Sequence, residues 1–456
     1  MWLGVLFSMM CMAEHFCLAA EDKPPGPPHK SQYMIQKYRE KAAQCLVLGN
    51  YTKPTDYTLE ALLLYLTTEQ IRSNDTQFGI SILVGIIVRS AMRMGYHRDP
   101  SHYPNISVFH AEMRRRIWST VVVFDILTSF QVGLPKLINE SQVDSELPRN
   151  LLDEDFDQHA VELPPPRPDT ECTLMSYAIM KHRLTSVFGM IANQATSTQT
   201  VSYADDVMRL DKLLYEVYGS VPPGLRMRPT ANSVTDSSAL IVRRFALEVF
   251  FQKSRCVLHR RYLVLARSNQ RYLYSRRSCV DAAMQLLGHQ SVLHNECQLG
   301  GLLHRDRWKI LPLMSQAFLL AAMIICLEFD HLIPRSQDVH AVSEEVSTEE
   351  SMLQVLQRSY SIWSESAASS TEALRVSAVL KMILQKVTPT ANDKDPDIPT
   401  KNHTDPSAWP APASSSTCTR TCLYCAQSSH FNRWQIKISP KPSQASTWRS
   451  VSVPGR

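Results

Sequence analysis

Residues 78–100 read FGISILVGIIVRSAMRMGYHRDP, and residues 108–135 read VFHAEMRRRIWSTVVVFDILTSFQVGLP. The first stretch is rich in apolar residues and predicts a helix that ends at Gly95, because glycine commonly ends helices. In the second, Met113, Ile117, Val121 and Phe124 recur at three- and four-residue spacing. This period predicts a single helix over Val108–Leu127.

The same helical period extends along most of the chain, and the alternation typical of strands is almost absent. The sequence therefore predicts an all-α fold, a large multi-helix domain. Further helices are predicted over Trp2–Phe16, Ser31–Leu48, Thr58–Ser73, Gly79–Met94, 171–194, 202–219, 237–265, 275–298 and 308–329, and a helical pattern follows from Ser347 to Lys386.

Proline clusters and changes of composition indicate how the chain is organised. We assign residues 1–158 to the N-terminal part of one helical domain and residues 159–170 to a Pro-rich surface connection. Residues 171–387 form the C-terminal part of the same domain. Residues 388–456 are rich in Pro, Ser, Thr and Asn with few apolar residues, so we expect a disordered tail.

The composition is that of a globular protein with a sizeable core, since 44% of its residues are hydrophobic. A net charge of +5 is too small to indicate nucleic-acid binding by itself. Most of the eleven cysteines stand singly, and Cys45, Cys256, Cys279 and Cys326 fall within apolar helical patterns. We therefore expect reduced, buried cysteines and no disulfide framework.

Two apolar stretches raise the question of a signal peptide or a membrane span. Trp2–Ala13 lacks a charged segment before it and is followed by Glu14 and His15, which favours a first core helix over a signal peptide. Residues 310–327 contain Pro312, Ser315 and Gln316, whereas a membrane span requires about 20 cleaner apolar residues. We expect a buried core helix there and no membrane partner.

No catalytic motif is present in the sequence. It contains no Gly-x-Ser-x-Gly elbow, Walker-type loop, His-Glu-x-x-His or Gly-x-Gly-x-x-Gly, so we assign no catalytic residue, no metal site and no cofactor and expect no enzyme. Cys418, Cys422, Cys425 and His430 supply enough ligands for one zinc ion, but they stand among Ser and Thr without apolar neighbours. Whether these cysteines bind anything is left open.

The consecutive arginines Arg114, Arg115 and Arg116 fan over about 200° of their helix, because each residue turns by about 100°. They cannot all face one DNA groove, so we expect structural ion pairs rather than phosphate contacts. Glu112 stands four residues before Arg116, the favourable order for a helical pair.

Asp125 lies further along the same helix and needs an arginine or a backbone donor if it is buried. Arg98, just after the preceding helix, is the candidate partner. We expect His97 to be a loop histidine held by hydrogen bonds rather than a metal ligand.

Together these motifs resemble the middle homology region of fungal zinc-cluster transcription factors, the fungal-specific regulatory domain. The residues that match its pattern, which we call the signature residues, are Arg89, Ala91, Gly95, His97, Arg98, Asp99, Glu112, Arg114, Arg115, Arg116, Trp118, Asp125, Gly133 and Pro135. Leu134 departs from the pattern, where the family commonly has Arg. Later, Leu258-His259-Arg260 and Ser275-Arg276 with Cys279 resemble two further family motifs, with Arg261 where Pro is usual.

The resemblance implies a regulatory domain that acts in the nucleus on transcription by RNA polymerase II, for a metabolic or secondary-metabolite gene set. It also implies a small-molecule effector or a masked activation segment, and a dimer or transcription-factor partner. The family binds DNA through an N-terminal six-cysteine zinc cluster. That spacing is absent from this sequence, so zinc is expected only in a missing cluster.

Two alternatives stay open. The chain is either such a regulator, or a DNA-binding-deficient adaptor or repressor that binds a full-length transcription factor. A secreted or membrane-attached helical protein is a third interpretation.

Overall fold

The computed structural model describes residues 1–19, 28–53, 55–72, 78–196, 202–309, 311–332, 343–367 and 371–387. Over these residues it contains thirteen α-helices and no strand, which confirms the all-α fold. The first six are α1 (Trp2–Ala19), α2 (Pro28–Leu48), α3 (Thr58–Arg72), α4 (Phe78–Arg93), α5 (Val108–Val132) and α6 (Leu174–Thr196). The others are α7 (Met208–Gly219), α8 (Ser238–His259), α9 (Tyr262–Leu265), α10 (Leu273–Cys297), α11 (Leu311–Leu332), α12 (Ser343–Ser366) and α13 (Thr371–Val387).

Four predicted helices differ from the structure. The helix predicted over 202–219 begins with a π-helical turn, Tyr203–Val207, and is α-helical only from Met208. The helix predicted to end at Leu127 continues to Val132, because its stop signal is Gly133 in the left-handed conformation. The helix predicted over 237–265 divides after His259, and the chain turns so that Tyr262 packs on Tyr203. The pattern that ends at Lys386 forms two helices, α12 and α13. The predicted tail, 388–456, with Cys418, Cys422 and Cys425, lies outside the described residues.

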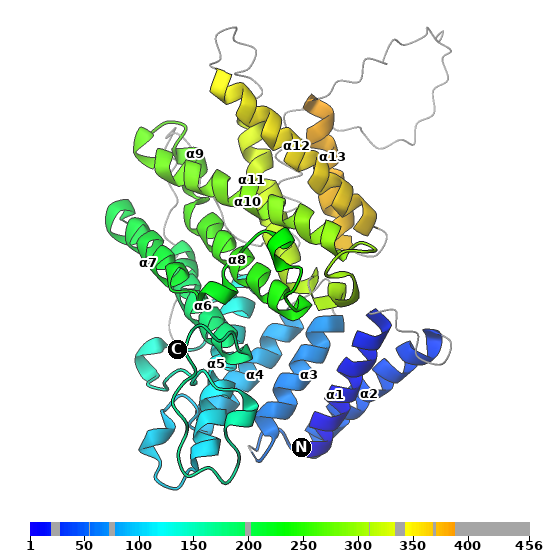
Figure 1. Ribbon diagram of the computed structural model, residues 1–456, viewed down its shortest axis with the longest axis vertical. Helices are drawn as coiled ribbons and strands as arrows, with labels where there is room; N and C mark the ends of the chain where they lie inside the picture. Colours follow the sequence, from blue (N-terminus) through cyan, green and yellow to red (C-terminus); the bar gives the residue numbers. More distant parts are fainter. Residues whose placement is uncertain are drawn as a thin grey trace, which may run out of the picture.

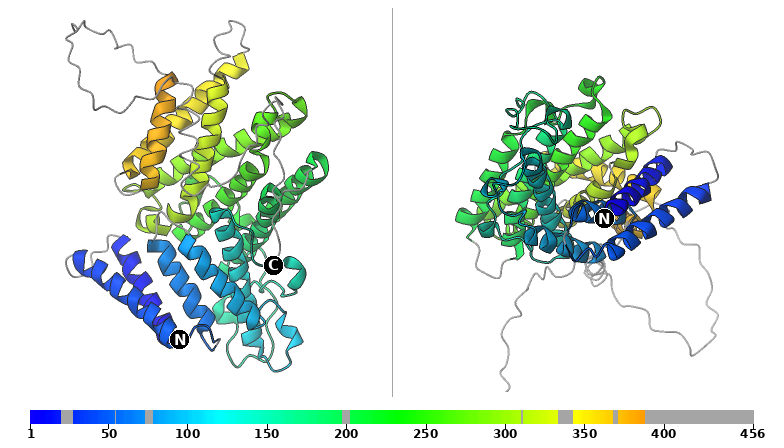
Figure 2. Two further views of the ribbon diagram at one scale, coloured as in Figure 1. Left: turned by 180° about the vertical axis from the view of Figure 1, so that it is seen from behind. Right: turned by 90° about the horizontal axis from the view of Figure 1, so that it is seen from below.

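The helices gather around two hydrophobic cores (Figure 1). Helices α1 to α4 lie towards one end of the molecule and α9 to α13 towards the other, with α8 between them, as the view from behind also shows (Figure 2). The smaller core includes Leu62 and Ile87 of α3 and α4, and the larger one is built mainly from α6, α8, α10 and α11. Helix α5 contributes Trp118 to the smaller core and Ile126 to the larger one, so it joins them.

The apolar helix predicted near residues 310–327 is α11, a core helix. Its Ala317, Ala321 and Ile325 are fully buried in the larger core. In the part of the chain that the structure describes, no helix combines the length and apolar character that a membrane span requires. Cys256, Cys279 and Cys326 are buried thiols outside any disulfide, as predicted, whereas Cys45 is only partly buried.

Gly95 ends α4 with a geometry that requires glycine. Its φ is +74°, and the N–H groups of Gly95 and Tyr96 donate to Met92 and Ala91 at 3.0 Å each. A Cβ at this position would lie 3.0 Å from the hydroxyl of Tyr103. The turn therefore brings the chain from α4 back towards α5.

We expect Gly95→Ala to lower the free energy of unfolding by about 1–3 kcal/mol, since an L residue there is strained and crowded. The matched control is Gly288→Ala in α10, where a Cβ meets nothing within 4 Å and should stabilise the helix by about 0.5–1 kcal/mol. Urea unfolding of both variants measures the difference. Equal effects of the two substitutions would contradict this account of Gly95.

Candidate functional site

The three consecutive arginines of α5 point to three different sets of partners. Arg115 makes a two-pronged pair with Asp99, with its Nε 2.9 Å from Oδ2 and its Nη2 2.8 Å from Oδ1. Arg114 donates to the carbonyl of Met94 at 2.7 Å, and its guanidinium lies 4.1 Å from the ring centre of Tyr96. These contacts join α5 to the turn that follows α4.

Arg116 forms the predicted helical pair with Glu112, at 3.2 Å, which confirms that expectation. It also donates to Asp153 at 2.6 Å and to the carbonyl of Leu151 at 3.1 Å, and its guanidinium lies over the ring of Phe156. All three arginines are therefore engaged in contacts inside the molecule. This is the arrangement that the fan around the helix predicts.

Three buried carboxylates among the signature residues accept main-chain N–H groups from residues 137–149, which we call the anchored segment. Asp125 accepts from Leu137 and Ile138 at 3.0 and 2.9 Å. Asp99 accepts from Glu146 at 3.0 Å, and Glu112 accepts from Arg149 at 3.2 Å. The segment is thus fastened to α5 and to the turn after α4 at both ends and along its length.

The predicted partner of Asp125 is wrong in one respect. The sequence predicts either an arginine or a backbone donor beside Asp125. Backbone donors are present, but Arg98 is not a partner of Asp125. Arg98 instead pairs with Asp144 of the anchored segment at 2.8 Å. The turn after α4 lies against the later part of the anchored segment, so Arg98 pairs with Asp144. Asp125 binds the start of the segment, at Ile138.

The two main anchoring carboxylates differ in their electrostatics. Burial raises the pKa of Asp125, and the N–H groups of Ile138 and Leu137 offset this only in part. Burial would also raise the pKa of Asp99, but hydrogen bonds from Arg115, Ser101 and Glu146 outweigh it and hold that pKa well below its usual range. Asp99 is therefore firmly ionised, whereas Asp125 anchors the segment without a charged partner in contact.

The remaining signature residues have separate positions. Gly133, with φ +70°, ends α5 ahead of Pro135 and allows the chain to enter the anchored segment. Arg89 is exposed on α4, away from these contacts. His97 lies in the turn after α4, and its carbonyl accepts the N–H of Asp144 at 3.2 Å. Its ring differs from the expectation, because among the described residues its Nδ1 is buried without a hydrogen-bond partner and the ring packs 6.3 Å from that of Trp118.

The anchored segment covers a cavity of about 210 Å³ against α5 and α6. The apolar part of its lining includes Trp118, Val122 and Ile138. Its polar part includes His182, which is 2.9 Å from Ser119, together with Ser145 and Ser186. The Oγ atom of Ser145 is buried and has no hydrogen-bond partner among the described residues. Ligand pockets commonly measure about 300–1,000 Å³, so this one suits a small organic molecule.

The charges around this cavity are one cation and two anions, namely Lys136, Glu140 and Glu146. Lys136 is already paired with Glu140. Burial lowers the pKa of His182, which keeps the imidazole neutral at pH 7. The lining therefore disfavours an anion and leaves neutral groups able to donate or accept hydrogen bonds.

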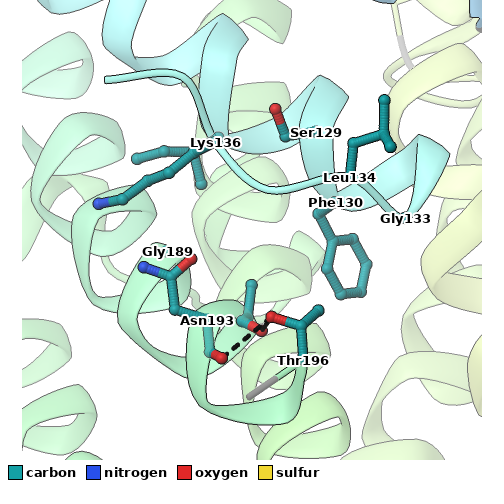
Figure 3. Close-up of a pocket in the computed structure, with 10 residues that line it drawn as sticks. Ser129, Phe130, Gly133, Leu134, Lys136, Gly189, Asn193 and Thr196 are labelled. Atoms are coloured by element: carbon teal, nitrogen blue, oxygen red, sulfur yellow. Dashed lines mark hydrogen bonds between the residues drawn. The ribbon is translucent and has the colours of Figure 1, made fainter. Parts of the chain in front are cut away.

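A smaller hollow adjoins it at the end of α5 (Figure 3). It lies between Phe130 and the Gly133–Leu134 turn on one side and Asn193 and Thr196 of α6 on the other. Its volume is about 20 Å³, enough for one water molecule. Ile126 and Lys136 line both spaces, so the two are neighbours.

The two later motifs of the sequence meet in the larger core. His259 of α8 has its Nδ1 2.9 Å from the hydroxyl of Ser275 on α10, and its Nε2 3.0 Å from Asp211 on α7. Tyr203 and Tyr274 complete the chain of hydrogen bonds, to Ser275 at 2.8 Å and to Asp211 at 2.6 Å. Burial alone would raise the pKa of Asp211, but the hydrogen bonds from His259 and Tyr274 lower it.

Ser, His and Asp are also the residue types of a hydrolytic triad, but this cluster has another role. Ser275 and His259 are fully buried and Asp211 is 4% exposed, so no substrate reaches the hydroxyl. The ring nitrogens also face their partners in the opposite order to a serine protease. The cluster holds α7, α8 and α10 together.

Sequence reasoning did not identify Asp211, Tyr203, Asp144 or the cavity. For Asp211 a signal existed, because it stands beside Leu210 and Leu214 on the apolar side of a predicted helix, where a charge needs a buried partner. For the cavity no signal existed. One wall of the cavity is the anchored segment, whose sequence has no helical or strand periodicity and which is held in place by its backbone N–H groups.

Residues 3–219 match the family model described as the fungal specific transcription factor domain, so this part of the chain is a domain of that family. The family consists of transcription factors and not of enzymes, as the sequence predicts.

Curated relatives cover most of the chain. It is 46% identical to the Zn(2)-C6 fungal-type transcription factor pigI of Monascus ruber, over 85% of this chain and 47% of the relative. It is 45% identical to the Zn(2)-C6 fungal-type transcription factor mpsB of Macrophomina phaseolina, over 85% and 52%. It is 37% identical to the equisetin cluster transcription factor eqxF of Fusarium heterosporum, over 86% and 56%. The chain spans about half the length of these relatives, and no solved structure matches it.

Asp125→Ala should lower the free energy of unfolding by about 1–3 kcal/mol, because the buried N–H of Ile138 loses its acceptor. Asp56→Ala, at an exposed position, is the control and should change it by less than about 0.5 kcal/mol. Urea unfolding gives both values, and hydrogen exchange at Leu137 and Ile138 shows whether the segment has come loose. An effect of Asp125→Ala below about 1 kcal/mol would contradict the anchoring role.

Proposed function

We propose that this chain is the regulatory part of a nuclear fungal transcription factor that controls a secondary-metabolite gene set. The support is the family membership together with relatives named for such clusters, among them the equisetin cluster factor. In this proposal DNA is read by a six-cysteine zinc cluster, and zinc is confined to that cluster. The helical domain adjusts the activity of the whole protein.

We further propose that the cavity beneath the anchored segment is the effector site of this domain. The single observation that carries this proposal is that the anchored segment, which covers the cavity, is held by the signature carboxylates Asp99, Glu112 and Asp125. A ligand placed there touches the segment and both α5 and α6 at once. Its occupancy can therefore bias how these parts are arranged.

The lining defines the chemistry of the effector. Trp118, Val122 and Ile138 favour an apolar body, and His182, Ser145 and Ser186 favour one or two hydroxyl, carbonyl or amide groups. The net negative charge of the lining disfavours a carboxylic acid. We therefore propose a small, neutral molecule with an apolar ring or chain.

Deleting the gene that encodes the chain should abolish the induced transcripts of one set of biosynthetic genes. Ser186→Leu, which fills the cavity, should leave those transcripts unresponsive to the culture conditions that induce them. Ser361→Leu, at an exposed position of α12, is the matched control and should respond normally. RNA sequencing measures the transcripts, and immunoblotting checks that protein levels are equal.

The outcomes separate the two parts of the proposal. Normal induction in the deletion strain would overturn the role in transcription. Normal induction in the Ser186→Leu strain, with the deletion strain defective, would overturn only the effector site.

The recombinant chain alone should give no sequence-specific mobility shift on promoter DNA, because Arg114, Arg115 and Arg116 are held in contacts within the molecule. Fusion behind a zinc cluster of a relative should produce such a shift. A specific shift by the unfused chain would contradict this. The adaptor alternative instead requires that the unfused chain bind a full-length relative and alter its shift.

A further inference from the structure

The hairpin formed by α9, the turn at Gln270–Tyr272 and the start of α10 carries an unusual surface. We call its exposed residues from Arg261 to Arg277 the basic hairpin surface. They include four arginines, three apolar side chains and no acid: Arg261, Val264, Leu265, Arg267, Ser268, Asn269, Gln270, Arg271, Tyr274 and Arg277. From Cys256 to Val280 the sequence has no Asp or Glu at all.

Within the part of the chain that the structure describes, no carboxylate neutralises the cations of this surface. Among the described residues, none of its four arginines forms an ion pair; Arg267 donates to the carbonyl of Leu327 at 3.1 Å, and Arg271 lies 5.9 Å from the ring of Tyr203. The nearby carboxylates are used elsewhere. Asp211 binds His259 and Tyr274, Glu328 binds Arg276, and Asp206 accepts the N–H of Ser202.

The apolar side chains among these arginines are well exposed. Val264 and Tyr274 are each 45% exposed, and Leu265 is 42% exposed. Arg277 follows Tyr274 by three residues on α10, so the two lie on one face of the helix. The surface therefore offers positive charge and apolar area side by side.

Aromatic packing holds the hairpin that carries this surface in place. Tyr203, Tyr262 and Tyr272 pack against one another with ring centres 4.9–5.2 Å apart, which ties the hairpin to the start of the α7 region. It lies at the outer edge of the molecule, remote from α1 and α2 (Figure 1). The basic hairpin surface and the cavity lie on different elements, because the cavity is lined by α5, α6 and the anchored segment.

We propose that the basic hairpin surface docks an acidic segment of a partner protein in which Asp and Glu alternate with apolar side chains. The four arginines match the carboxylates, and Val264, Leu265 and Tyr274 match the apolar residues. Duplex DNA fits less well, since a phosphate backbone makes no use of exposed leucine and valine. This inference goes beyond the effector site and does not depend on it.

The test uses fluorescence anisotropy of the full chain with three labelled synthetic peptides of about 20 residues. The first combines acidic residues with Leu and Phe, the second replaces its acids by Asn and Gln, and the third replaces its apolar residues by Ser. The first peptide should bind at least about tenfold more tightly than either of the others. Its binding should weaken between about 50 mM and about 500 mM NaCl.

Charge reversal locates the site. The variant R261E/R267E/R271E/R277E should lose at least about tenfold in affinity for the first peptide. The control K37E/K41E/K53E/R183E reverses four exposed cations elsewhere and should bind as the wild type does. Leu265→Ser, a single exposed change that the fold tolerates, should weaken binding severalfold.

Each contrary result overturns the proposal. If the control variant weakens binding as much as the hairpin variant, the loss of affinity comes from the overall charge of the protein and not from a site on the hairpin. If the serine peptide binds as tightly as the first, the surface is a simple polyanion site. If promoter DNA or phosphatidylserine vesicles bind more tightly than the peptide and compete with it, the partner class is wrong.

Discussion

The structure depends on buried carboxylates that accept main-chain N–H groups. Asp99, Glu112 and Asp125 are spread over the turn after α4 and along α5, and each takes N–H groups from residues 137–149. At the firmly ionised Asp99 such bonds are stronger than those between neutral groups. They let an irregular segment occupy a fixed place on a helical surface, and the segment in turn forms the wall of the cavity.

The same arrangement explains the three arginines. A buried carboxylate needs compensation, and Arg115 and Arg116 supply it to Asp99 and Glu112. Arg114 does something else, stacking on Tyr96 and closing the end of α4. The cluster of positive charge that suggests nucleic-acid binding in the sequence is therefore part of the framework of the domain.

Sequence alone predicted the parts of this protein that follow from periodicity. The all-α class, the approximate bounds of α1 to α6 and the core position of α11 come from the spacing of apolar residues, which burial enforces. The pairing of Arg116 with Glu112 follows from a helical distance of four residues. The partners of Asp125 and Arg98 did not follow, because they lie in a segment whose path is set by tertiary contacts. The division of α8 from α9 was missed for the same reason, since Tyr262 turns to meet aromatic rings that are distant in sequence.

Helix α5 has side chains in both cores, with Trp118 in one and Ile126 in the other. Neither core is complete without it, so we expect the two ends of the molecule to unfold together and not as separate bodies. A protease cut within residues 159–170 would break the chain but leave both pieces clasped to one another. Genes that encode only one of those pieces would yield proteins with a bare apolar face, prone to aggregate.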